Sequence, residues 1–190
     1  MLPFLLIFST RKRIFLKRNS FLVNKSILAE VKQALPEVEL DILSDLYPDY
    51  QIDVAAEQEK LRQVDVIVFQ YPLYWYAVPS LLQKWLEKVF VHGFSHGASG
   101  DALKGKYVIA SLTTGAGEAA YQAESGTSIE DLLAPIRLTA KLTQLNYLGH
   151  IVTHDVSYLL RQDADKAQEI LAKSKDHAKQ LIALIQQLDD

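Results

Sequence analysis

The sequence of 190 residues contains no cysteine. Disulfide bonds, thiolate nucleophiles and cysteine-ligated metal sites are therefore excluded, and the composition is compatible with a reducing cytoplasm. No apolar run approaches the roughly 20 residues that a membrane-spanning helix needs. A large excess of one charge is also missing. Because the formal net charge is only −3, nucleic acid is not indicated as a partner.

The composition that is present is that of a globular protein, with 49% hydrophobic and 23% charged residues. The length suits one domain, and we expect a single domain over residues 1–190. The first apolar stretch, LPFLLIF, precedes its basic neighbours, whereas a signal peptide places basic residues first. We therefore interpret residues 2–8 as a core strand, with a poorly structured end as the alternative.

Apolar runs alternate with helical patterns along the chain. Strands are expected at 2–8, 37–43, 65–70, 106–113 and 150–156. Helices are expected at 20–35, from Asp53 through VAAEQEKLRQV, after Pro79 in the first turn, at 128–144 and at 163–188. This order predicts a parallel sheet with helices on both faces. Ligands of such sheets bind beyond the carboxyl ends of the strands, where the strand order reverses.

An aromatic segment, QYPLYWYAVPS, closes the apolar run at 65–70. Pro72 stiffens the turn, and Trp75 is a candidate to cover the ring of a flat heteroaromatic ligand. The same rings are equally consistent with a plug at the end of the core, because aromatic side chains bury large areas. The composition of the segment leaves both interpretations open.

The segment TTGAGE, residues 113–118, follows the next strand. Its glycines and hydroxyls would let a ring system approach the backbone closely. Taken alone, it is more typical of an ordinary turn, and it matches neither the dinucleotide nor the Walker A fingerprint. Two successive strand ends with ring-binding chemistry together predict a planar cofactor at one edge of the sheet.

Four of the histidines, His92, His96, His150 and His154, lack the spacing of metal ligands on one helix face. No metal site is therefore expected. Structural roles are the favoured interpretation for such isolated histidines.

Two long segments, FQYPLYWYAVPSLLQKWLEKVFVHGFSHG and LKGKYVIASLTTGAGEAAY, resemble the flavodoxin-like NAD(P)H:quinone oxidoreductases. The resemblance runs from about Asn24 to about Asp155. Within the family it is greatest to the ancillary proteins of glutathione-regulated potassium efflux systems, which LYPDYQIDVAAEQEKL also fits. It implies a flavodoxin-like α/β fold with a five-stranded parallel sheet in the order 2-1-3-4-5. It further implies FMN as cofactor, with FAD as the alternative, and NAD(P)H as substrate.

The resemblance also implies which residues form the site. Tyr121 matches an aromatic position of the nicotinamide and quinone pocket, and Tyr121 or His96 would donate a hydrogen bond to the reduced quinone as a general acid. The ring and phosphate of the flavin would be held by Asn24, Pro72, Leu73, Tyr74, Trp75, Thr113, Thr114, Gly115 and Ala116.

Three positions depart from the family pattern. The segment FSTRKRIFLKRN (8–19) lacks the usual His-Pro turn, and its five basic residues suit either phosphate binding or, the favoured reading, a solvated loop. Ala116 stands where a second glycine is common, so a negative φ is expected there. Thr127 occupies a position where related quinone reductases carry a histidine.

The leading functional hypothesis is a flavoenzyme that reduces quinones or related electrophiles with NAD(P)H by two-electron hydride transfer. The alternative is a regulatory subunit that activates a glutathione-gated potassium/proton antiporter without turnover. A one-electron carrier is disfavoured, because such carriers are strongly acidic. The resemblance implies a homodimer with a shared site, formed by the aromatic region 71–96. It also implies a cytoplasmic protein or one bound peripherally at the inner face of the cell membrane.

Overall fold

The computed structural model describes residues 4–8, 20–156 and 164–188. Its sheet contains β1 (Phe4–Phe8), β2 (Glu39–Ile42), β3 (Val66–Pro72), β4 (Tyr107–Thr113) and β5 (Asn146–Thr153). Every pair of neighbouring strands is parallel, and the order is β2-β1-β3-β4-β5. This is the order that the flavodoxin-like resemblance implies.

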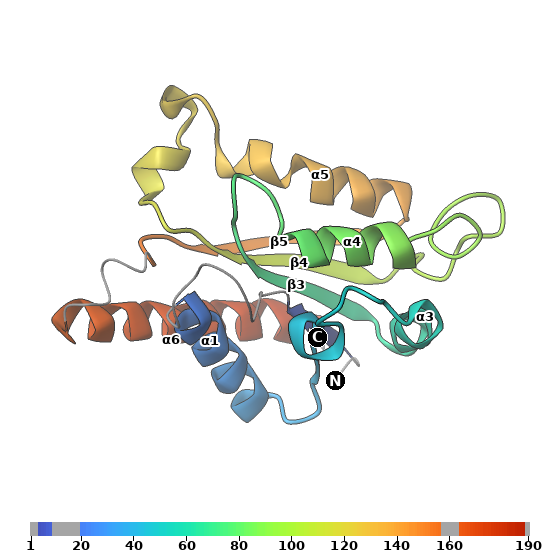
Figure 1. The fold of residues 1–190 in the computed structure, drawn as a ribbon, viewed down its shortest axis with the longest axis horizontal. Coiled ribbons are helices and arrows are strands. Elements are labelled where there is room, and N and C mark those ends of the chain that lie inside the picture. The colour runs from blue at the N-terminus through green and yellow to red at the C-terminus, as the bar shows by residue number, and fades with distance from the viewer. Residues whose placement is uncertain (1–3, 9–19, 157–163, 189–190) are drawn as a thin grey trace.

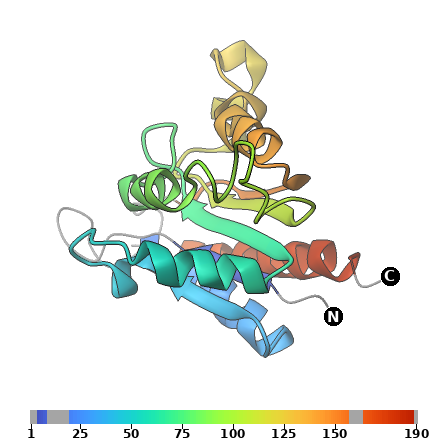
Figure 2. The same cartoon turned by 90° about the vertical axis from the view of Figure 1, so that its right-hand side faces the viewer.

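Helices cover both faces of the sheet, which confirms the predicted α/β class (Figures 1 and 2). The helices are α1 (Ser20–Ala34), α2 (Leu43–Leu46), α3 (Val54–Gln63), α4 (Ser80–Val89), α5 (Ile129–Leu142) and α6 (Ala164–Gln186). Two 3₁₀ turns, η1 (Glu118–Tyr121) and η2 (Ala123–Ser125), lie between β4 and α5. No helix within the described ranges is long and apolar enough to cross a membrane.

Local signals placed most element ends correctly. Asp53 caps α3 as predicted, because its carboxylate accepts a hydrogen bond from the amide of Ala56 at 3.1 Å. Pro79 was expected in the first turn of α4, but it is the N-cap residue, one position before that turn. The prediction for the last strand was wrong at both ends, since β5 spans Asn146–Thr153 and not 150–156. Gly149, with φ 139°, lies where the pairing register of β5 with β4 is irregular. This irregularity interrupts the alternation of side chains between the two faces of the sheet, so the strand was difficult to locate from its sequence.

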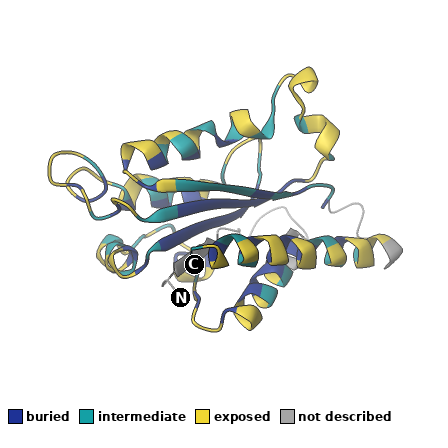
Figure 3. Cartoon of the chain, turned by 180° about the vertical axis from the view of Figure 1, so that it is seen from behind, coloured by how far each residue is buried: buried dark blue, intermediate teal, exposed yellow. Residues whose placement is uncertain are grey.

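Alternating strand residues fill two separate apolar clusters. Ile67 and Phe69 face α3, α4 and α5, whereas Val66 and Val68 face α1 and α6. The central strands β3 and β4 are accordingly buried along nearly their whole length, while the helices are exposed on their outer sides (Figure 3). At roughly 25 cal/mol per Å² of apolar surface, this two-sided burial is the main stabilising contribution to the fold.

Polar side chains replace apolar ones near the carboxyl ends of the strands, on the face covered by α1 and α6. The buried His177 of α6 bridges two strands, with Nδ1 2.7 Å from Thr153 Oγ1 and Nε2 2.6 Å from Ser111 Oγ. Ser111 Oγ donates to Gln70 Oε1, so it accepts from His177 Nε2–H. Burial lowers the pKa of His177 to about 4, so the ring is neutral at pH 7.

The same buried network continues to α1. Gln70 Nε2 donates to Asn24 Oδ1 at 2.6 Å, and Asn24 Nδ2 donates to Thr113 Oγ1 at 3.2 Å. Because buried polar groups are costly without partners, this chain of bonds fixes the orientation of Asn24 and Thr113. The network thus makes the carboxyl end of β4 rigid.

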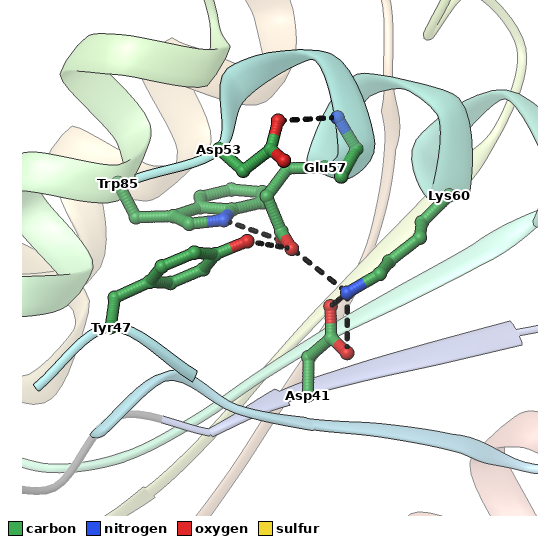
Figure 4. Close-up of polar contacts among 7 residues, drawn as sticks. Asp41, Tyr47, Asp53, Glu57, Lys60 and Trp85 are labelled. Carbon is green, nitrogen blue, oxygen red and sulfur yellow. Dashed lines mark hydrogen bonds and ion pairs between the residues drawn. The ribbon is translucent and has the colours of Figure 1, made fainter. Parts of the chain in front are cut away.

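A second polar cluster lies on the opposite face, between β2, α3 and α4 (Figure 4). The fully buried Glu57 accepts hydrogen bonds from Tyr47 Oη at 2.7 Å, Trp85 Nε1 at 2.8 Å and Lys60 Nζ at 2.8 Å. Lys60 also pairs with Asp41 at 2.8 Å. Burial raises the pKa of Asp41 to about 6, although Lys60 acts to lower it. The cluster therefore fastens α3 and α4 to the edge of the sheet.

We expect Glu57→Leu to lower the free energy of unfolding by about 3–5 kcal/mol, because removing one member of a buried ionic cluster leaves its partners unpaired. Urea denaturation measures the change. The matched control is Glu59→Leu, at a position on the same helix whose side chain is 62% exposed, where we expect a change within about 0.5 kcal/mol. A loss below about 1 kcal/mol for Glu57→Leu would contradict the role given to the cluster.

His177 should make stability depend on pH. Its pKa of about 4 in the folded chain lies below its ordinary value of 6.5, so the unfolded chain binds the proton more readily between these values. The stabilisation is complete above the ordinary pKa and is lost as the pH falls toward 4. The stability difference between the wild type and His177→Gln should therefore shrink by about 2 kcal/mol from about pH 7 to about pH 5. A difference that is independent of pH would be incompatible with a buried neutral imidazole.

Candidate functional site

The carboxyl ends of β3 and β4 lie side by side. Pro72 pairs with Thr113 at the last position of the strand register, and the amide of Leu73 donates to the carbonyl of Thr113 at 2.8 Å. The loops that leave the two strands, residues 73–78 and 114–121, therefore begin at the same point of the sheet (Figure 1). The sequence predicted this convergence of the aromatic and TTGAGE segments.

The aromatic segment forms a tight turn. Tyr74 and Ala77 exchange two backbone hydrogen bonds of 3.0 Å, and the two residues between them, Trp75 and Tyr76, have φ values of 50° and 63°. Two successive positive φ values are typical of a type I′ turn, which favours glycine or asparagine. Large aromatic residues in this conformation cost about 1–3 kcal/mol each, so the turn holds strain.

The exposure of the aromatic rings distinguishes between the two interpretations of this segment, a plug of the core and a wall of a ligand site. Tyr71 is buried and plugs the end of the core. Trp75 is 94% exposed and Tyr76 is 62% exposed, so neither ring contributes to the core. Strained backbone that displays an exposed tryptophan is characteristic of binding sites.

The loop after β4 presents a row of unpaired amides. Thr114 is buried, and its hydroxyl donates to the carbonyl of Ala116 at 2.8 Å. The amides of Gly115, Ala116 and Gly117 have no acceptor among the residues that the structure describes. A Cβ added at Gly115 would meet no atom within 4 Å, and Ala116 avoids positive φ as expected. The loop therefore offers several donors beside open space, which suits the carbonyl-rich edge of a flavin ring.

Tyr121 lies above the same loop, in η1. Its ring stacks on that of His154, with centroids 5.5 Å apart and planes inclined by 30°. Burial raises the pKa of Tyr121, and nearby Tyr76 raises it further, whereas the Thr114 hydroxyl lowers it. The turn at Tyr76 and the loop at Thr114 thus both face Tyr121, and its phenol stays protonated at neutral pH.

The residues predicted near the phosphate are described only in part. Asn24 is buried in α1 and bonded to Thr113, so it lies next to the loop. The five basic residues between 11 and 18, for which a solvated loop was favoured over phosphate binding, lie outside the described residues, and both interpretations stay predictions.

His96 is remote from Tyr121 within one chain. It follows the C-terminal end of α4, whereas the turn at Trp75 precedes the N-terminal end (Figure 1). Its Nδ1 lies 3.0 Å from Ser95 Oγ. His96 and Tyr76 instead both line a groove of about 350 Å³ between α4 and α5. A site that contains both His96 and Tyr121 would need a second copy of the chain.

Sequence reasoning missed several residues that shape the site. The hydrogen-bonded set of Gln70, Ser111 and His177 was not identified, although Gln70 and Ser111 are polar residues within otherwise apolar runs. His154 was assigned a structural role, and no local signal links it to Thr114, which lies 40 positions earlier. Among the described residues, no group of three or more His, Asp or Glu side chains is arranged to hold a metal ion.

Comparison with known proteins identifies relatives over most of the chain. The family model described as flavodoxin-like fold matches residues 5–181. The glutathione-regulated potassium-efflux system ancillary protein KefF of Enterobacter sp. (strain 638) is 45% identical over 131 residues, which is 69% of this chain and 74% of that protein.

Two solved structures extend the similarity. The general stress protein 14 of Treponema denticola, solved in complex with FMN, is 31% identical with a TM-score of 0.81, and the alignment covers 96% of this chain and 99% of that one. An NADPH-quinone reductase from P. pentosaceus is 26% identical with a TM-score of 0.72, over 93% of this chain and 98% of that one. The chain therefore belongs to the family of proteins with the flavodoxin-like fold.

Proposed function

We propose that the chain binds FMN at the carboxyl ends of β3 and β4 and reduces a quinone or a related electrophile with NAD(P)H. The observation that carries the proposal is that the amides of Gly115, Ala116 and Gly117, which have no acceptor within the described ranges, and the exposed ring of Trp75 lie on loops that begin at adjacent strand ends. The similarity to a structure solved with FMN and to an NADPH-quinone reductase supports the choice of cofactor and reaction. FAD is the alternative cofactor.

The described residues fit a flavin. Pro72, Leu73, Tyr74 and Trp75 would lie along the ring system, and the loop from Thr113 to Ala116 would hold its polar edge. Asn24 would lie toward the phosphate. When bound, FMN supplies the capacity to accept and donate a hydride, while the protein sets its orientation and its electrostatic surroundings.

The chain's own residues would bind and orient the electron acceptor. The amide N–H groups of the loop favour negative charge that develops at the polar edge of the ring. Tyr121, whose pKa is raised, keeps its proton and can donate a hydrogen bond to a carbonyl oxygen of the acceptor. The exposed ring of Trp75 would shield the bound ring from water. NAD(P)H and the acceptor would occupy the same pocket in turn.

A regulatory role is the second candidate, because the KefF protein is 45% identical over 69% of this chain. In this role the chain would bind the cytoplasmic part of a potassium/proton antiporter and activate it without turnover. Both roles place the protein in the cytoplasm, and the regulatory role adds a peripheral association with the inner face of the membrane.

We further propose a homodimer. The groove between α4 and α5 is lined in part by Leu142, 62% exposed, and α5 also carries Leu138, 66% exposed. Such a surface is unusual on a monomer. A second copy packed there would also supply the His96 that one chain keeps away from Tyr121.

The dimer is tested with Leu142→Glu, which places a charge on the exposed apolar face. We expect the wild type to sediment as a dimer and Leu142→Glu to shift the distribution to monomers. The control is Lys141→Glu, at the neighbouring exposed position, for which we expect the dimer to persist. A wild type that sediments as a monomer at all concentrations would refute this surface as a dimer interface.

The flavin site is tested with Trp75→Ala. We expect the wild type to quench FMN fluorescence on binding and to oxidise NADPH when menadione is present. Loss of the ring should raise the dissociation constant for FMN about tenfold, the effect of about 1.4 kcal/mol of lost stacking. Lys175→Ala, a change on the outer side of α6, should leave it unaffected.

The same variant separates the two candidate functions. No NADPH oxidation at any FMN concentration would exclude the enzymatic function. If Trp75→Ala abolished flavin reduction but the variant still activated the antiporter in membrane vesicles, the regulatory role would be the physiological one. Failure of the chain to associate with the antiporter would count against the regulatory role.

A further inference from the structure

His154 is held rigidly beside the Thr114 loop. It follows β5 directly, and backbone hydrogen bonds flank it on both sides. The amide of Thr114 donates to the carbonyl of Thr153 at 2.9 Å, and the amide of Val156 donates to the carbonyl of Thr114 at 3.0 Å. The imidazole is therefore positioned by the same β4–β5 pairing that positions the loop.

A single hydroxyl fixes the protonation pattern of this imidazole. Thr114 Oγ1 has one hydrogen, which it donates to the carbonyl of Ala116 at 2.8 Å. With that hydrogen on the carbonyl of Ala116, Thr114 Oγ1 accepts its second bond, of 2.9 Å, from Nδ1–H of His154. The proton of the neutral ring then lies on Nδ1, and the lone pair lies on Nε2. Nε2 has no hydrogen-bond partner among the residues that the structure describes.

His154 also borders a cavity of about 360 Å³. The titratable groups around the imidazole are Glu118 and Tyr121 from η1, the adjacent Asp155, Lys173 from α6, and His150 and Glu130 across the cavity. Burial lowers the pKa of His154 and Lys173 lowers it further, whereas Glu118 and Asp155 raise it. Glu130 is already paired with Arg137.

We propose that His154 is a proton-accepting group of this site, which takes up one proton at Nε2 when a planar aromatic anion, such as a phenolate or the enolate of a hydroxyquinone, binds beside Tyr121. The inference deepens the proposed function, on which it rests, because such an anion has the charge of a reduced quinone. The step balances as follows: a ligand anion, a neutral imidazole and one hydrated proton taken up from the solution give an ion pair of ligand and imidazolium.

The surroundings explain why the proton is needed. Glu118 would repel an anion in the cavity, and Tyr121 can offer a hydrogen bond but no positive charge. An imidazolium at His154 supplies that charge where the anion binds, and Thr114 remains bonded to Nδ1–H in both states. A neutral quinone carries no negative charge that needs to be compensated, so its binding should not change the protonation of His154.

The test compares two probes over a range of pH. Lawsone is a hydroxynaphthoquinone whose acidic hydroxyl is ionised at neutral pH, whereas menadione has no ionisable group. The range is from about pH 8 to about pH 6, which spans the ordinary pKa of histidine. We expect the affinity of the full chain for lawsone to increase as the pH falls, with a limit of about tenfold per pH unit for uptake of one proton. The affinity for menadione should not change with pH.

Variants assign the proton to one residue. His154→Gln should abolish the pH dependence of lawsone binding, whereas His150→Gln, at the other histidine of the cavity, should retain it. Absence of lawsone binding, binding that is independent of pH in the wild type, or pH dependence that survives in His154→Gln would each overturn the proposal.

A measurement on the wild type alone needs neither variant nor flavin. Nitrogen-15 NMR of the histidine rings should show His154 as the Nδ1–H tautomer in the free chain and as imidazolium in the lawsone complex. The Nε2–H tautomer in the free chain would overturn the proposal. If FMN fails to bind while the tautomer and the lawsone dependence are found, the proposed function fails and this inference stands. If FMN binds and turnover occurs, but His154→Gln leaves the pH dependence of lawsone affinity unchanged, the inference alone fails.

Discussion

The candidate site depends on the parallel pairing of β3 with β4. The register brings Pro72 and Thr113 to the same level, and the bond from Leu73 to Thr113 extends the pairing beyond the strands. Two loops of different chemistry, one aromatic and one rich in free amides, are thereby forced to begin at adjacent points. A shift of the register by one residue would reverse the faces of all following side chains and separate the two loops.

Rigid support lies directly beneath these loops. His177 joins β4 to β5, and the bonds that continue through Gln70 and Asn24 reach Thr113 from below. On the other side of the sheet, Glu57 holds α3 and α4 in place. The strain in the turn at Trp75 and Tyr76 is therefore balanced by a well-bonded framework. Rigid elements that carry strained loops are the arrangement that preorganises a binding site.

The sequence predicted the architecture well because apolar runs and caps are local signals. The buried strands at 65–70 and 106–113 and the cap at Asp53 needed only neighbouring residues to be identified. The type I′ turn could not be predicted in this way, since Trp75 and Tyr76 are poor residues for positive φ and only the framework holds them there.

The polar contacts could not be predicted from the sequence for a different reason. Ser111 and His177 are 66 positions apart, and Thr114 and His154 are 40 positions apart, so only the completed sheet brings them together. The family resemblance supplied candidate flavin residues along the chain. It did not supply His154, because the contacts that suggest its role join residues that are far apart in the sequence.

The central claim is that the loops after β3 and β4 hold one flat redox cofactor between them. Nitrogen-15 NMR spectra of the full chain, recorded during addition of FMN, test it most directly. We expect the amide signals of Gly115, Ala116 and Gly117 and the indole signal of Trp75 to shift together and to saturate at one FMN per chain. Signals from these residues that stay unchanged while FMN binds elsewhere would contradict it.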